Sequence, residues 1–133
     1  MVGQLKILAA GLILGLAGCA ASGPTAVAEK GREALVKERA QARWDAVVND
    51  RLDVAYGYFS PASRSLFSLT DYIRTVKVGF WKAAQVDGVE CQEEEFCDAL
   101  VTIEYEFQGR RVRTPMRESW IRTDGNWWYV KKS

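Results

Sequence analysis

Glu118 is the residue of this chain best placed to do acid–base chemistry. It lies in the segment "RESWIRT", where alternating residue types predict a β-strand with Met116 and Trp120 on the same face. A carboxylate on an apolar face costs several kcal/mol unless it is paired or hydrogen-bonded. It therefore serves either as the anchor or base of a pocket with tyrosine hydroxyls as partners, or as a structural glutamate, paired or bonded to a tyrosine and partly exposed to solvent. The candidate pocket residues are Glu118, Tyr56, Tyr72, Tyr105, Trp120 and Lys131.

The residue types that the chain lacks exclude other kinds of site. There is no histidine, which excludes histidine-activated nucleophiles and histidine metal ligands. Neither GxGxxG nor GxxxxGK(S/T) occurs, so nucleotide binding has no motif. The 18 basic and 17 acidic residues nearly balance, which gives no support for nucleic-acid binding. We expect no cofactor, no metal and no nucleic-acid partner.

The second half of the chain must form the sheet that carries Glu118. "CDALVTIEYEF" alternates between apolar and polar residues, and Gln108-Gly109 is a plausible two-residue hairpin turn after it. That turn places two acidic residues opposite two arginines, Glu106 with Arg111 and Glu104 with Arg113. Asp124-Gly125 predicts a second turn, whose register puts Lys131 opposite Glu118 and turns Glu118 toward the helices. A less regular strand at about 80–91 precedes these, with a bulge expected at Gly88.

The first half of the chain predicts the helices under that sheet. A long amphipathic helix is expected over residues 29–49, because apolar residues recur every three to four positions. Asp50 is a candidate cap for a second helix in "RLDVAYGYF", and Ser60-Pro61 starts one or two turns in "PASRSLF". Ser68 or Thr70 caps the last helix, "SLTDYIRTV". The predicted fold class is α+β: three N-terminal helices packed on a curved four-stranded antiparallel sheet.

Three quoted segments also carry a family resemblance. "RWDAVVNDRLDVAYGYFSPASR", a following helix with Tyr72, and "RESWIRTDGNWWYV" together resemble the nuclear transport factor 2-like superfamily over nearly all of residues 29–133. The resemblance implies a sheet curved into a cone, often with an apolar pocket at its wide end. Ketosteroid isomerase-like members use a carboxylate and a tyrosine there, but this chain has no second acid obviously placed to complete an oxyanion site. A fold shared this widely does not settle function.

The N-terminal 18 residues differ from the rest of the chain. Lys6 is followed by the apolar run "ILAAGLILGL", which is too short to span a bilayer and is typical of a secretory signal peptide. The next residues, Leu16-Ala17-Gly18-Cys19, resemble the lipobox of bacterial lipoproteins. That resemblance implies a signal peptide at 1–18, acylation of Cys19, and attachment to the membrane through this lipid anchor. Since Ala20 rather than aspartate follows Cys19, it also implies sorting to the outer membrane.

The remaining cysteines, Cys91 and Cys97, are then a pair. An oxidising periplasm allows them to form a disulfide, whereas two cysteines without histidine supply too few soft ligands for a metal site. The bridge would join the two strands of the first hairpin. Its acidic tip, "QEEEF", is expected to be a solvated loop. Small uncharged residues make 19–28 a lipidated, flexible tether, which leaves 29–133 as the folded domain.

Three functional hypotheses follow. The first is a non-catalytic envelope lipoprotein that binds a small apolar ligand or a protein partner near the outer membrane. The second is an isomerase- or dehydratase-type enzyme that uses Glu118 and tyrosines. The third is an assembly subunit that meets its partner through the outer sheet face, with Trp128 and Ile121. A filled core would oppose both pocket hypotheses.

Overall fold

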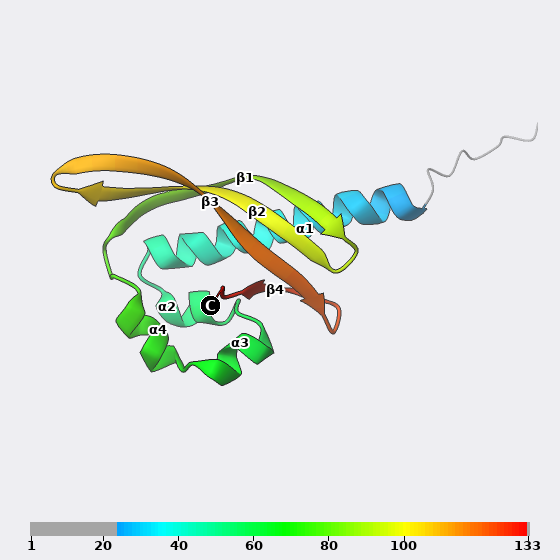
Figure 1. The fold of residues 1–133 in the computed structure, drawn as a ribbon, viewed down its shortest axis with the longest axis horizontal. Coiled ribbons are helices and arrows are strands. Elements are labelled where there is room, and N and C mark those ends of the chain that lie inside the picture. Colours follow the sequence, from blue (N-terminus) through cyan, green and yellow to red (C-terminus); the bar gives the residue numbers. More distant parts are fainter. Residues whose placement is uncertain (1–23, 133) are drawn as a thin grey trace, which may run out of the picture.

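Four helices precede a four-stranded antiparallel sheet in this protein (Figure 1). The structure, a computed structural model, describes residues 24–132, so the predicted signal peptide and Cys19 lie outside the described residues. The helices are α1 (Pro24–Val48), α2 (Leu52–Tyr56), α3 (Pro61–Leu66) and α4 (Leu69–Thr75). The strands are β1 (Trp81–Glu93), β2 (Phe96–Phe107), β3 (Arg110–Thr123) and β4 (Asn126–Val130), in the sheet order β1-β2-β3-β4.

Both predicted hairpin registers are confirmed. Gln108 and Gly109 have φ of 50° and 73°, and Asp124 and Gly125 have φ of 52° and 76°, as tight two-residue hairpin turns require. The first turn pairs Glu104 with Arg113, whose guanidinium Nε lies 3.2 Å from the carboxylate. The β1–β2 register shifts between Val86 and Gly88, which confirms the predicted bulge.

The helices differ from the prediction in three respects. There are four segments rather than three, because the turns after Ser60 form a helix of their own, with the Ser60 hydroxyl accepting from the Ser63 amide. Helix α1 begins at Pro24, five residues before the predicted start, and so includes part of the segment expected to be a tether. Asp50 does not cap α2. Its carboxylate accepts instead from the Gly79 amide, at 3.1 Å.

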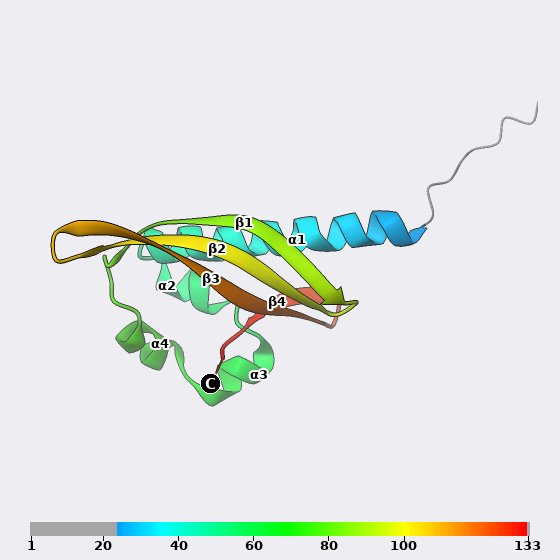
Figure 2. The ribbon, with the colours of Figure 1, turned by 45° about the horizontal axis from the view of Figure 1, so that its top comes forward.

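The core lies between the sheet and the helices. Helix α1 runs along one face of the sheet, α2 and α3 lie near the end of β4, and α4 packs against α2 (Figures 1 and 2). Val36, Ala40, Trp44 and Val47 are buried, as the apolar spacing of this helix predicts. The far end of the β2–β3 hairpin extends beyond the helices in both views. We call its residues 104–115 the arm. Within the described part of the chain, no helix is long and apolar enough to cross a membrane.

Candidate functional site

Glu118 is buried in a hydrogen-bonded ion pair. Only 2% of its surface is exposed, whereas Glu106 on the arm is exposed, which confirms that the register turns Glu118 toward the helices. Its Oε1 accepts from the Arg43 guanidinium Nη1 and from the Trp44 indole Nε1, each at 2.8 Å. Both donors come from α1. A charged pair with an additional hydrogen bond offsets much of the desolvation cost of burying a carboxylate.

Arg43 is held by aromatic rings as well as by Glu118. Its guanidinium carbon lies 3.8 Å from the centre of the Tyr129 ring and 5.6 Å from that of Phe59. Burial by itself lowers the pKa of Arg43, but the carboxylate of Glu118 and the nearby phenols outweigh it and raise that pKa. The guanidinium is therefore a fixed positive charge and takes no part in proton exchange.

Two tyrosines complete this interior. Burial raises the pKa of both Tyr72 and Tyr129, because a phenolate would have to exist away from water, and the charge of Arg43 only partly offsets the effect. Both hydroxyls thus stay protonated near neutral pH. Glu118 Oε2, Arg43 Nε and Trp120 Nε1 are buried atoms without a hydrogen-bond partner among the described residues.

The predicted partner of Glu118 was wrong. Strand β4 ends at Val130, one residue before Lys131 could pair with Glu118, and Lys131 is exposed. The Lys131 ammonium lies 4.6 Å from the centre of the Phe67 ring. The arginine on α1 provides the positive charge instead.

The other candidate pocket residues do not gather around one cavity. Trp120 is fully buried, and Tyr72 lies in an aromatic cluster with Tyr56, at a ring separation of 6.0 Å. The Tyr56 hydroxyl donates to the Phe67 carbonyl, at 2.8 Å. Tyr105 is at the base of the arm, where its ring stacks on Phe80. The expectation of one pocket built from these six residues is therefore not met.

Sequence reasoning missed Arg43, although a signal for it was present. Arg43 follows Ala40 by three residues and precedes Val47 by four, which is the spacing of the apolar stripe of α1. A charged residue within an apolar stripe needs a buried partner of opposite charge. Glu118 was already identified as an acid needing such a partner.

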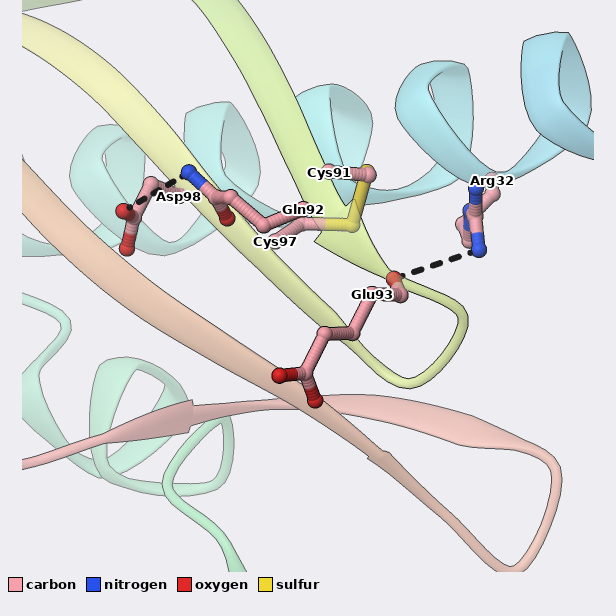
Figure 3. The surroundings of a disulfide bond; sticks show 6 residues. All are labelled: Arg32, Cys91, Gln92, Glu93, Cys97 and Asp98. Atoms are coloured by element: carbon pink, nitrogen blue, oxygen red, sulfur yellow. Dashed lines mark hydrogen bonds between the residues drawn. A yellow bond between two sulfur atoms is a disulfide. The ribbon is translucent and has the colours of Figure 1, made fainter.

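The predicted disulfide between Cys91 and Cys97 is present and joins β1 to β2 close to their turn (Figure 3). Beside it, Arg32 of α1 donates to the Glu93 carbonyl, at 3.2 Å. These contacts fix the hairpin end against the first part of α1. Among the described residues, no cluster of three potential metal ligands occurs.

On the surface of the described residues, neither of two clefts is lined by a candidate pocket residue. The first, of about 620 Å³, lies between α1 and the ends of two hairpins; it is lined by Gly31, Arg32, Leu35, Cys91, Gln92, Glu93, Glu94, Arg122, Gly125 and Trp127. The second, of about 450 Å³, is lined by Asp87, Leu100, Val101, Pro115, Met116 and Arg117. The buried acid of this protein therefore does not face either opening.

Comparison with known proteins supports the fold alone. No family model and no curated protein matches the chain. A SEC-C motif containing protein from Psychrobacter arcticus has a similar structure, with a TM-score of 0.61 and 11% identity over 72% of this chain and 58% of that one. The solution structure of a SEC-C motif containing protein from Rhodopseudomonas palustris has a TM-score of 0.56 and 15% identity over 70% of this chain and 73% of that one. The chain thus spans little more than half the length of the first protein. The α+β arrangement of helices on a four-stranded antiparallel sheet is confirmed.

Proposed function

We propose that this protein is a non-catalytic envelope lipoprotein, anchored through Cys19, whose domain binds a protein partner near the outer membrane. The observation that carries the non-catalytic part is the pairing of Glu118 with Arg43 and Trp44 in the core. A catalytic base must reach a substrate proton, either directly or through one water molecule. A carboxylate that accepts two hydrogen bonds from α1 and is 2% exposed serves the fold instead.

The same observation favours a protein partner over a small apolar ligand. A small-molecule site is a concave, mostly apolar cavity with a few convergent polar groups. Here the aromatic side chains pack on one another and on Arg43, and neither of the two clefts described above is lined by Glu118 or the candidate tyrosines. A binding role therefore falls to the outer surface of the domain.

The envelope location is supported by two features of different kinds. The lipobox-like residues Leu16-Ala17-Gly18-Cys19 follow an apolar run of signal-peptide length. The Cys91–Cys97 disulfide suits the oxidising periplasm. Membership of the nuclear transport factor 2-like superfamily is also part of the proposal, supported by the resemblance of residues 29–133 and by the helices packed on an antiparallel sheet.

The anchor is tested by Cys19→Ala. Labelling with radioactive palmitate should disappear, and the protein should remain at its precursor mass. Cys97→Ala, which removes a cysteine outside the lipobox, is the control and should retain the label. Palmitate incorporation that survives Cys19→Ala would refute the lipoprotein assignment.

The absence of a small-molecule role is tested on the processed protein from membranes. Native mass spectrometry in a mild detergent should give the mass of the lipidated chain without an additional small molecule. A stoichiometric apolar adduct that is lost in Glu118→Gln but kept in Glu104→Gln would support the pocket hypotheses and refute this proposal.

A further inference from the structure

Arg39 lies about one helical turn before the buried Arg43 on α1, but its surroundings differ. Its guanidinium carbon lies 5.0 Å from the centre of the Tyr58 ring and 5.4 Å from that of Trp128. Its Nε donates to the Trp127 carbonyl, at 2.6 Å. A planar guanidinium stacks favourably on aromatic faces, so these contacts hold this side chain in place without a carboxylate.

A second guanidinium meets the same tryptophan. Arg64 comes from α3, and its guanidinium carbon lies 5.5 Å from the centre of the Trp128 ring. Its Nε is buried and has no hydrogen-bond partner in the described part of the chain. Two different helices thus bring two positive charges to one ring. We call Arg39 and Arg64 the arginine pair.

The arginine pair has no counter-charge among residues 24–132. The ion pairs formed by the described residues use other arginines, as the pairing of Arg43 with Glu118 illustrates. Neither α3 nor β4 contains an acidic residue. Like charges held close together repel each other, and an anion bound between them would remove that repulsion. Arg39, Arg64 and Trp128 are each only partly buried, so a solute can reach them.

The chemistry of two guanidiniums selects the kind of anion. Each guanidinium has five N–H donors in a rigid fork, which matches the oxygens of a carboxylate or a phosphate group. The two oxygens of a carboxylate are occupied by one fork when it binds in the bidentate manner. A phosphate group has further oxygens that can accept from a second fork. Two guanidiniums at one ring therefore fit a phosphate group better than a carboxylate.

We propose that the arginine pair binds a phosphate group beside the Trp128 ring, with Arg39 and Arg64 both donating to its oxygens. The headgroup of an anionic lipid and a soluble phosphate share this chemistry. The site is separate from the buried Glu118 pair, and its three residues line neither of the clefts described above. It goes beyond the protein-binding role proposed above and depends neither on that role nor on the lipid anchor, so its failure would leave both standing.

The test follows side-chain N–H signals by NMR in the protein purified from the envelope, in a neutral detergent. Sodium phosphate is added at constant ionic strength, and sodium chloride serves as the reference. The Nε–H signals of Arg39 and Arg64 and the indole N–H signal of Trp128 should shift together and reach saturation. A drift that does not saturate, or that chloride reproduces, would overturn the proposal.

Charge variants locate the site. Arg64→Gln should weaken phosphate binding about tenfold, because it removes charge-assisted hydrogen bonds. Arg113→Gln makes the same change on the arm, in an arginine that already pairs with Glu104, and should leave the affinity unchanged. Equal weakening in the two variants would show that phosphate responds only to the net charge of the protein, and would refute the site.

Thermal unfolding gives a second measurement that needs no assigned signals. Phosphate should raise the melting temperature of the parent protein and of Arg113→Gln, because a ligand stabilises the state that binds it. The rise should be much smaller in Arg64→Gln. Arg64→Lys keeps the charge but loses the planar fork, so its rise should be intermediate. An equal rise in all four proteins would overturn the proposal.

Two soluble probes distinguish the sources of the phosphate group. Inorganic phosphate represents the free anion, and glycerophosphoglycerol, the deacylated headgroup of phosphatidylglycerol, represents a membrane lipid. Tighter binding of glycerophosphoglycerol would assign the site to a lipid headgroup, whereas tighter binding of inorganic phosphate would assign it to a soluble phosphate. The absence of saturable binding by both probes would overturn the proposal.

Discussion

The two halves of β3 have the same alternating pattern but different surroundings. In the half near β4, Glu118 and Trp120 are buried under the helices. In the other half, which belongs mainly to the arm, Arg113 is largely exposed and even the inner-face Val112 is only partly buried. Alternation along a strand therefore indicates which side chains share a face. Whether that face is covered depends on where the helices end.

The largest effect on stability is expected when one carboxylate charge is removed from the core, and it is compared with removal of one carboxylate charge from the arm. Glu118→Gln leaves Arg43 buried without its counter-charge and should lower the free energy of unfolding by about 3 kcal/mol or more. Glu104→Gln makes the same chemical change on the arm and should cost at most about 1 kcal/mol. Urea unfolding of both variants gives the two values. Similar losses of unfolding free energy in the two variants would show that the buried and the more exposed carboxylate contribute equally to stability.

Replacing Arg43 and Glu118 together tests whether the loss of stability comes from the unpaired buried charge. Arg43→Met with Glu118→Leu removes both charges and should recover most of the stability lost in Glu118→Gln, because a buried ion pair is often replaceable by apolar side chains. No recovery would indicate that Trp44 or the tyrosines, rather than the charge pair, determine the effect.

The disulfide between β1 and β2 should have an intermediate effect. Its two cysteines are six residues apart, so the chain-entropy model gives about 2 to 2.5 kcal/mol for the closed loop. Cys91→Ser with Cys97→Ser should lower the urea midpoint accordingly, and a reducing agent should affect the parent protein but not this variant. Free thiols at both positions in protein taken from the envelope would contradict the bridge.

The buried tyrosines predict an alkaline loss of stability. The folded-state pKa values of Tyr72 and Tyr129 lie above the ordinary value of 10.0, chiefly because of burial. Their contribution is fully present below that pH and is lost as the pH rises through the folded-state values, since the unfolded chain then binds fewer protons. Melting temperatures should fall above pH 10, and absorbance at 295 nm should show these two phenols titrating last. Tyr72→Phe should make the fall less steep.

The smallest effect is expected on the arm. Arg113→Ala breaks an exposed pair with Glu104 and should change the free energy of unfolding by less than about 1 kcal/mol. The measured melting curve should nearly overlay that of the parent protein. A large loss would mean that the arm helps to hold the core, against the contrast drawn between the two halves of β3.

The sequence was sufficient to predict the registers of the sheet, but it was not sufficient to predict the partner of Glu118. Turn residues such as Gln108-Gly109 and Asp124-Gly125 act locally, so they set both registers and thereby turn Glu118 inward. The partner of Glu118 depends on how α1 crosses the sheet, and no local signal determines that packing. Lys131 was opposite Glu118 on the extrapolated register, but β4 ends one residue too early for it to pair.

Tyr105 shows the same limit at the other end of the sheet. Its place on the inner face was predictable, but no local signal in the sequence shows how far along the strands the helices cover that face. The sheet extends beyond the helices at that end, so Tyr105 packs on Phe80 and Trp81 rather than in the interior. Phe107, two residues further, is 58% exposed for the same reason.

The early start of α1 determines how the domain would stand on a membrane. If Cys19 is lipidated as proposed, only residues 20–23 separate the anchor from the helix at Pro24, and the five residue steps from Cys19 to Pro24 span at most about 18 Å. The start of α1 and the tip of the arm lie at opposite ends of the molecule (Figures 1 and 2). Such a short connection would keep the end of the domain where α1 begins near the lipid headgroups. The arm would then point into the periplasm, where a passing protein can reach it.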